Sequence, residues 1–206
     1  MNSEKPDLYL ASQSPRRREL LQQIGVNYRT LTVNVPEAPL SGERPEAYVQ
    51  RLAREKSRAG CAELIVRSLA PAPVLGADTI VVCDDAILEK PQDEQHAAAM
   101  LRLLSGRTHQ VLTAVALSDA MHSEARLCTT HVKFRVLEER EISAYWQTGE
   151  PHDKAGGYGI QGLGAVFISD LRGSYTGVVG LPIETTVSLL QQFGVPWWQP
   201  VRNIHE

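Results

Sequence analysis

Two neighbouring apolar stretches, residues 108–118 and 126–136, constrain the fold of this chain more than any other feature. Each is long enough to form a strand, and a short polar segment, residues 119–123, lies between them. Two long strands joined by so short a connection pair antiparallel, because parallel strands need a crossover of a dozen or more residues. The sheet is therefore expected to be at least partly antiparallel.

Strand and helix patterns alternate along the rest of the chain. Apolar runs predict further strands, whereas a 3.6-residue period bounded by cap residues predicts helices. The expected strands are 8–11, 28–33, 74–82, 165–169 and 175–179, and the expected helices are 15–24, 45–66, 93–105, 138–147 and 182–193. This order predicts an α/β fold with a mixed sheet. No composition break or Gly/Ser/Pro linker divides residues 1–206, so one domain is expected. The tail 195–206 is expected to cap the core of this domain, and the alternative is that it contacts a second subunit.

The amino-acid composition restricts the kinds of ligand that this chain is expected to bind. A net charge of -3 and an isoelectric point near 6.1 give no global basic field, so small anions are better partners than nucleic acid. No stretch reaches membrane-spanning length, and the first apolar run is too short for a signal peptide. The three cysteines match neither a redox pair nor a zinc site, and the six histidines, His109 among them, show no ligand spacing. A cytoplasmic protein is expected.

Three arginines, Arg16, Arg17 and Arg18, stand where a helix usually favours acidic residues. Ser14 is a good N-cap and Pro15 fits the first helical position, so the arginines occupy the first turn. Cations there are unfavourable by up to about 1 kcal/mol each unless an anion compensates. Backbone N–H groups and guanidinium forks together suit phosphate, and polyphosphate best. The alternative is that the arginines extend into solvent or pair with surface acids.

Asp78 interrupts the apolar strand 74–82. A buried carboxylate costs several kcal/mol without partners, so a cation, a metal ion or backbone donors should lie beside it. The alternative is a structural aspartate that bonds its own turn. Thr79 should point to the opposite sheet face if the pleat is regular.

Three other charged residues could join Asp78. Lys90 lies on a loop just after the predicted strand and suits phosphate neutralisation. Glu37, also on a loop, could share a divalent cation with Asp78, because hard cations take carboxylate and phosphate oxygens together. Lys56 lies on a helix whose charges mostly suit a solvated face, and its spacing alone does not distinguish it.

Residues 149–165 form a glycine-rich segment with five glycines between positions 156 and 164. The segment contains neither the GxxxxGK[ST] motif nor a GxGxxG placed between a strand and a helix, so both phosphate-loop readings fail. Gln161 offers the donor and acceptor needed to read a base edge, Asp153 and Lys154 offer charge, and Tyr158 offers a stacking face. The alternative is a simple flexible loop.

Taken together, the segments SQSPRRREL, RLAREK, LGADTIV, LEKP, MLRLLSGRTHQV, DKAGGYGIQGLG and GSYTGVVGLPIET resemble the Maf family of nucleoside triphosphate pyrophosphatases. The resemblance covers residues 8 to about 190, in family order and spacing. It implies a cytoplasmic homodimer with an elongated mixed sheet of the inosine triphosphatase-like kind. It also implies a divalent cation (Mg, Mn or Co) and hydrolysis of a nucleoside triphosphate to the monophosphate and pyrophosphate.

The resemblance also implies individual roles. Asp78 matches the proton acceptor, and Arg16, Thr79 and Gln161 match specificity positions of the branch that acts on dTTP and UTP. The sister branch, which acts on 7-methyl-GTP, usually has Trp and Glu in place of Arg16 and Gln161. That specificity and a non-enzymatic role in septum formation are the alternatives. The wider pocket is implied to use Ser12, Arg17, Lys56 and Lys90 for phosphate, and Glu37 with Asp78 for metal.

Overall fold

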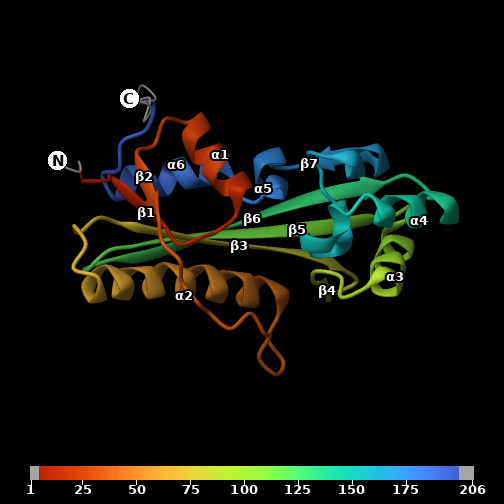
Figure 1. Ribbon diagram of the computed structural model, residues 1–206, viewed down its shortest axis with the longest axis horizontal. Helices are drawn as coiled ribbons and strands as arrows, with labels where there is room; N and C mark the ends of the chain where they lie inside the picture. The colour runs from red at the N-terminus through yellow and green to blue at the C-terminus, as the bar shows by residue number, and fades with distance from the viewer. Residues whose placement is uncertain (1–4, 200–206) are drawn as a thin grey trace.

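A seven-stranded mixed sheet forms the centre of the computed structural model, which describes residues 5–199 (Figure 1). The strand order is β2-β1-β3-β5-β6-β7, and β4 pairs separately with β3. β1 runs parallel to β2 and β3, whereas the other pairs are antiparallel, so the expected mixed sheet is confirmed. The strands are β1 (Leu8–Leu10), β2 (Tyr28–Thr30), β3 (Val74–Cys83), β4 (Ala86–Leu88), β5 (Thr108–Ser118), β6 (Ser123–Phe134) and β7 (Ile168–Arg172).

Helices cover both faces of this sheet. α2 packs on one face of β3, β5 and β6, and α5 and α6 pack on the other (Figure 1). The helices are α1 (Pro15–Gln23), α2 (Pro45–Val66), α3 (Glu94–Leu104), α4 (Glu139–Gln147), α5 (Tyr175–Val179) and α6 (Ile183–Gln192). Three short 3-10 helices, η1 (Glu150–Asp153), η2 (Ala155–Gly157) and η3 (Leu163–Phe167), follow α4.

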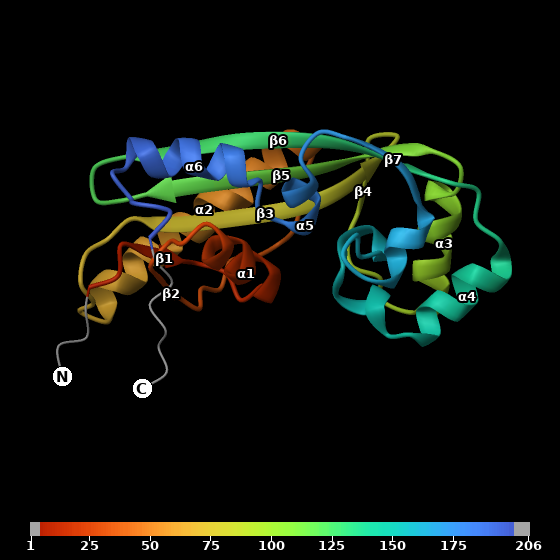
Figure 2. The same ribbon diagram turned by 90° about the horizontal axis from the view of Figure 1, so that it is seen from above.

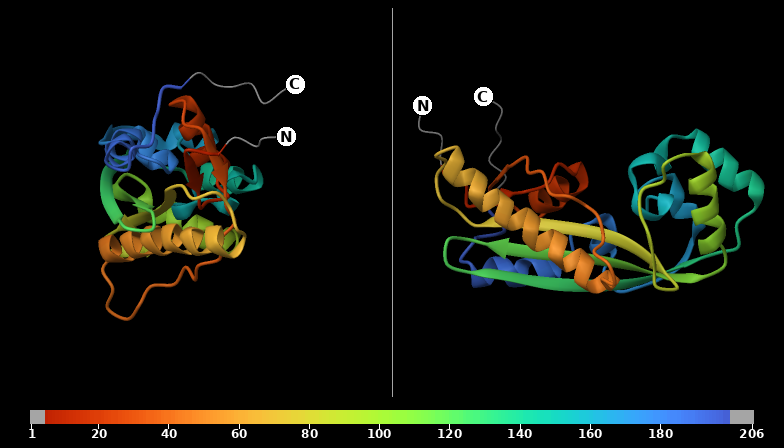
Figure 3. Two further views of the ribbon diagram at one scale, coloured as in Figure 1. Left: turned by 90° about the vertical axis from the view of Figure 1, so that its left-hand side faces the viewer. Right: turned by 90° about the horizontal axis from the view of Figure 1, so that it is seen from below.

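The long strands β3, β5 and β6 join two unequal lobes (Figure 2). We call the part formed by β4, α3, α4, η1–η3 and β7 the small lobe, and the rest of the described chain the large lobe. Figure 3 shows α2 crossing the sheet within the large lobe, away from α3 and α4. Each lobe has its own buried apolar cluster, one around Leu21, Leu75 and Leu189 and the other around Leu104, Phe134 and Tyr145. The cavity described below lies between these clusters.

Most predicted elements agree with the structure, but residues 175–179 were wrongly predicted as a strand. The run Tyr-Thr-Gly-Val-Val is rich in strand-forming residues, yet it forms the short helix α5. The Ser174 side chain accepts a hydrogen bond from the Gly177 backbone N–H at 3.0 Å and so caps the helix. This local cap outweighs the weak strand propensity of the run.

Three smaller differences concern element boundaries and one cap. The strand predicted at 165–169 is β7, which begins three residues later because 163–167 form η3. The strand predicted at 126–136 is β6, which begins and ends earlier. Ser14 occupies the N-cap position of α1, but its side chain makes no cap bond, and its N–H donates instead to the Ser12 hydroxyl at 3.2 Å.

The C-terminal segment caps the large lobe as predicted, as far as residue 199. Val195 is buried and Trp197 packs beside it against the apolar cluster of the large lobe. The Trp198 N–H donates to the Ile24 carbonyl at 2.7 Å, which ties the segment to the end of α1. The last part of the predicted cap, residues 200–206, lies outside the described residues.

Two further predictions concern the whole described chain. None of its helices combines the length and the apolar character needed to cross a membrane. All three cysteines are free thiols, and burial raises the pKa of Cys61 and Cys83.

Candidate active site

The candidate site lies at an interruption in the pairing of β3. On one edge of β3, β1 pairs with Val74 and Leu75, and β4 pairs from Val81 onward. Between them no described strand covers residues 76–80 on that edge, while β5 pairs along the whole opposite edge. Side chains that leave β3 toward either face can therefore reach one shared space at this gap.

Close packing of α2 on β3 fixes one wall of the gap. A Cβ atom on Gly76 would lie 2.3 Å from the Ala53 carbonyl oxygen and 2.5 Å from the Ser57 backbone nitrogen, so only glycine allows this approach. The Ser57 hydroxyl also donates to the Val74 carbonyl at 2.9 Å. These contacts set the position of α2 along β3 and bring Lys56 opposite Asp78.

Lys56 joins two carboxylates from different parts of the chain. Its ammonium group lies 2.7 Å from Asp78 Oδ1 and 2.5 Å from Glu37 Oε1. The side chains of Lys56 and Asp78 are mostly buried, and that of Glu37 is half exposed. Partial burial acts to raise the pKa of Glu37, but the hydrogen bond and charge of Lys56 outweigh it and lower that pKa. Both the expected cation beside Asp78 and the proximity of Glu37 to Asp78 are thus present, whereas the surface role favoured for Lys56 is wrong.

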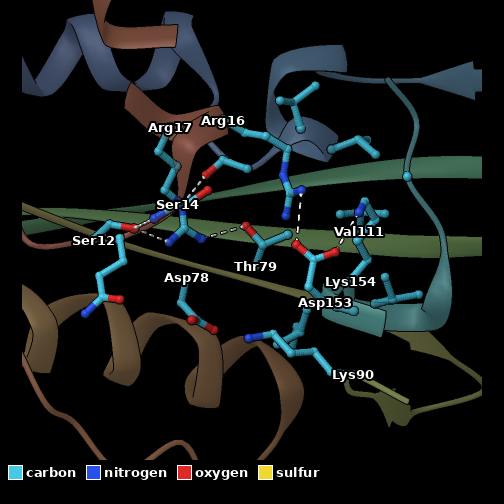
Figure 4. A pocket seen from close by; sticks show the side chains of 18 of the residues that line it. Ser12, Ser14, Arg16, Arg17, Asp78, Thr79, Lys90, Val111, Asp153 and Lys154 are labelled. Atoms are coloured by element: carbon cyan, nitrogen blue, oxygen red, sulfur yellow. Dashed lines mark hydrogen bonds and ion pairs between the residues drawn. The ribbon is translucent and has the colours of Figure 1, made fainter. Parts of the chain in front are cut away.

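Arg17 binds the opposite face of the same strand. Its guanidinium group donates to the Ser12 hydroxyl at 3.1 Å, the Thr79 hydroxyl at 3.2 Å and the Gly180 carbonyl oxygen at 2.8 Å (Figure 4). Thr79 also lies 3.0 Å from the Thr113 hydroxyl on β5. The pleat is regular here, so Asp78 faces α2 and Thr79 faces α1, as predicted.

Among the described residues, no acidic side chain contacts the guanidinium group of Arg17. Within residues 5–199, all three groups that accept its hydrogen bonds are neutral, and no carboxylate lies within 4 Å. Burial lowers the pKa of Arg17, and the more distant charge of Asp78 opposes this shift. A partly buried cation held only by neutral acceptors is stabilised when an anion joins it. The first turn of α1, which contains no acidic residue, adds unpaired backbone N–H groups at the same place.

A cavity of about 830 Å³ occupies the gap and extends between the lobes. The large lobe contributes the start of α1, Glu37, Lys56, Asp78 and Thr79 to its wall, and the small lobe contributes Lys90 and the segment 150–162. Lys90 is exposed at the rim, where its charge helps to lower the pKa of Glu37. Every site residue predicted from the sequence therefore lines one cavity.

One ion pair crosses the cavity between the lobes. Arg16 on α1 lies 3.7 Å from Asp153 on η1, and Lys154 contacts the same carboxylate at 2.6 Å (Figure 4). Lys154 also donates to the Glu150 backbone carbonyl at 2.8 Å. Burial acts to raise the pKa of Asp153, but Lys154 and Arg16 lower it overall. Asp153 and Lys154 thus supply charge to the cavity, as their sequence context suggested.

Gln161 lies on an exposed turn of the cavity wall, where its side chain is open to a ligand. The surrounding segment is built from η1, η2 and η3, so it is an ordered structure rather than a simple flexible loop. Sequence reasoning missed the residues that order it, Glu150 and Tyr145, whose hydrogen bonds reach Gly159, Leu163 and Gly164. The sequence carried no signal for this pair, because the partners of Glu150 include backbone N–H groups 13 and 14 residues away.

Tyr158 does not offer the stacking face suggested for it. Its ring is 5 % exposed and packs edge-on against Phe134, and its hydroxyl lies 2.8 Å from His109 Nε2. His109 is itself buried, and burial lowers its pKa to about 4, so it is neutral at neutral pH. His109 is therefore a buried structural residue.

Comparison with known proteins agrees with the motifs. Residues 7–193 match the sequence profile of the family described as Maf-like protein. The chain belongs to the Maf family. A dTTP/UTP pyrophosphatase of Saccharophagus degradans is 58 % identical over 193 residues, covering 94 % of this chain and 91 % of the relative. Proteins of the same name from Aromatoleum aromaticum (52 % identical, covering 92 % of this chain and 96 % of the relative) and Escherichia coli O157:H7 (53 %, 90 % and 92 %) are also similar.

Among solved structures, the Ham1 protein of Staphylococcus aureus resembles this chain with a TM-score of 0.47 and 15 % sequence identity. The similarity covers 90 % of this Maf chain and 96 % of the Ham1 chain.

Proposed function

We propose that this Maf protein hydrolyses dTTP and UTP to the monophosphate and pyrophosphate. The observation that carries the proposal is Arg17, a partly buried cation whose hydrogen-bond acceptors among residues 5–199 are all neutral. One of these acceptors is Thr79, the neighbour of Asp78 on β3. The names of the three relatives support the choice of substrates. Arg16, Thr79 and Gln161 support it too, since they match the pyrimidine branch and not the branch that acts on 7-methyl-GTP.

Asp78 is the proposed proton acceptor for the water that attacks the α-phosphorus. Lys56 contacts one oxygen of this carboxylate at 2.7 Å, and Asp78 lines the cavity in which the water would lie. The proton would move from the water to Asp78 as the α-phosphorus–oxygen bond forms and the bond to pyrophosphate breaks. The charge of Lys56 compensates that of the mostly buried carboxylate.

Arg17 and the first turn of α1 are proposed to bind the oxygens on which charge develops as pyrophosphate leaves. Such preorganised donors make a large contribution in phosphoryl chemistry. Lys90 and Arg16, on opposite sides of the cavity, would add charge along the triphosphate. Thr79 fixes the Arg17 guanidinium group, and Gln161 would pair with the pyrimidine edge.

The divalent cation implied by the family fits the donor set in part. Glu37 and Asp78 lie against the same ammonium group, and Mg²⁺ is typically held by one or two carboxylates together with substrate phosphates. The described residues contain no group of three or more potential ligands that would form a complete protein site. Glu37 and Asp78 would therefore hold the cation only together with the triphosphate, where it would neutralise phosphate charge. Oxygen donors of this kind favour Mg or Mn over softer metals.

The test is pyrophosphate release by the purified protein from dTTP, UTP, CTP, GTP and 7-methyl-GTP, with Mg or Mn. Release from dTTP and UTP well above the other three would support the proposal. Release mainly from 7-methyl-GTP would assign the sister specificity, and no release from any nucleotide would favour the regulator of septum formation. The homodimer, the cytoplasmic location and the single domain over residues 1–206 stay predictions.

A further inference from the structure

The Glu150 carboxylate is the hub of the segment that carries Gln161. It accepts hydrogen bonds from the Tyr145 hydroxyl at 2.7 Å, the Leu163 backbone N–H at 2.7 Å and the Gly164 backbone N–H at 3.0 Å. Burial acts to raise the pKa of Glu150, but these three hydrogen bonds outweigh it and lower that pKa. The group is therefore an ionised acceptor at neutral pH, and hydrogen bonds to charged groups are the stronger class.

Tyr145 holds the other end of the same segment. Its hydroxyl accepts a hydrogen bond from the Gly159 backbone N–H at 3.1 Å while it donates to Glu150. The ring is 4 % exposed and packs edge-on against Phe167, with 4.9 Å between the ring centroids. Burial, with the hydrogen bond to Glu150, raises the pKa of Tyr145 above its ordinary value, so the hydroxyl keeps its proton.

The glycines of the segment make room for this pair. A Cβ atom on Gly162 would lie 2.2 Å from Glu150 Oε2, and one on Gly164 would lie 2.6 Å from the Tyr145 hydroxyl. These glycines thus allow the backbone to close around the Tyr145–Glu150 pair, rather than around a phosphate as in nucleotide-binding glycine loops. The bonded backbone groups flank Gln161 on both sides, at 159 and at 163–164.

We propose that Tyr145 and Glu150 act as a clamp that positions Gln161 for base recognition. This inference rests on the proposed function. Neither clamp residue needs to touch the substrate. Without the clamp, the turn carrying Gln161 would sample several positions, and the fixed geometry on which base discrimination depends would be lost. The phosphate-binding Arg17 and its partners Ser12 and Thr79 belong to the other wall and would keep their positions.

The experiment replaces Tyr145 by Phe, which removes the hydroxyl and keeps the ring. We expect kcat/KM for dTTP relative to CTP to fall by about 10-fold, as suits the loss of a hydrogen bond to a charged group. Most of the change should be in KM, with kcat altered by less than about threefold, because the groups at the α-phosphorus are untouched. Affinity for inorganic tripolyphosphate, which has no base, should equal that of the wild type.

Ser105→Ala is the matched control. The Ser105 hydroxyl accepts a hydrogen bond from the Leu137 backbone N–H at 2.8 Å, also in the small lobe but away from the cavity. The Ser105→Ala variant should lower thermal stability as Tyr145→Phe does, but it should leave the ratio of kcat/KM for dTTP to that for CTP unchanged. Glu150→Gln is the second clamp variant, and Gln161→Glu gives the effect of altering the base-reading side chain directly. Both should also lower the ratio.

Two results would overturn the clamp. One is an unchanged dTTP/CTP ratio in both clamp variants while Gln161→Glu changes it. The other is an equal loss of affinity for tripolyphosphate and for dTTP, which would indicate general disorder of the cavity. Failure of the proposed function looks different, because the wild type itself would then release no pyrophosphate from dTTP or UTP.

Discussion

Replacing Asp78 by Asn separates catalysis from binding more sharply than any other single change. The carboxylate loses its charge and its ability to accept a proton, but the amide oxygen can still accept the hydrogen bond that Lys56 makes at 2.7 Å. Lys56 also keeps Glu37 at 2.5 Å, so its buried ammonium group is not left alone. The fold should therefore lose only about 1–2 kcal/mol of stability, less than the roughly 3–5 kcal/mol typical of a broken buried ion pair.

The expected loss of rate is much larger. General acid–base catalysis contributes typically 10²–10⁴-fold, so kcat for dTTP should fall by at least about 100-fold, equivalent to roughly 2.7 kcal/mol in the barrier. Binding should not weaken, because the change removes a negative charge from a cavity that would hold a triphosphate. The dissociation constant of an α,β-imido dTTP analogue should stay within about threefold of the wild type, or decrease.

Single-turnover pyrophosphate release measures the rate, calorimetric titration of the imido analogue measures binding, and thermal unfolding measures the fold. For a chain of this length a loss of 1–2 kcal/mol lowers Tm by roughly 2–8 °C. Weaker analogue binding that accounts for the whole loss of kcat/KM would refute the reasoning, since Asp78 would then hold the metal or the structure. A full rate would remove it from the proton transfer altogether.

Two further predictions test the charge of the cavity and the buried core beside it. Arg17→Lys should weaken tripolyphosphate binding by about 10- to 100-fold, because a single ammonium group cannot replace the fork that reaches both Ser12 and Gly180; equal binding in a calorimetric titration would contradict the anion site. Burial lowers the pKa of His109 to about 4 in the fold, against about 6.5 when unfolded, so between these values the unfolded state binds more protons. Stability should therefore decrease as the pH is lowered from 6.5 to 4, by up to about 3 kcal/mol. His109→Gln should flatten urea unfolding free energies between pH 6.5 and 4, and an unchanged slope would show that another group is responsible.

The sequence predicted correctly those helices and strands whose periodicity and end signals lie within the segment itself. Helix α2 and strand β5 match the predicted ranges residue for residue, since a long apolar period and clear end signals act within each segment. Residues 175–179 were wrong because a short run of strand-forming residues was decided by one serine cap and by contacts with β5 and β6. Short segments carry too few residues for propensity to outweigh one hydrogen bond and tertiary packing.

The site residues could be identified one by one from the sequence, but the ion pairs and hydrogen bonds between them could not. Lys56 has the spacing of a surface lysine, and it is buried only because Gly76 lets α2 approach β3 and because the loop with Glu37 covers it. Glu150 gave no chemical signal, since its partners are backbone N–H groups of residues 13 and 14 positions away. Interactions set by tertiary approach leave no periodic pattern in the sequence.

The interruption at β3 explains how two neighbouring strand residues can serve one ligand. Side chains of Asp78 and Thr79 point to opposite faces of the sheet, and inside a fully paired sheet they would occupy separate spaces. Because β1 ends its pairing at Leu75 and β4 begins at Val81, a ligand lying across the open edge can contact both faces at once. The Asp78 carboxylate then reaches the ligand from the face that α2 covers. The Thr79 hydroxyl, which accepts a hydrogen bond from Arg17, lies on the face that α1 covers. The two proposed roles, proton acceptance and anion binding, would thereby be separated by the thickness of one strand and still meet at one phosphate chain.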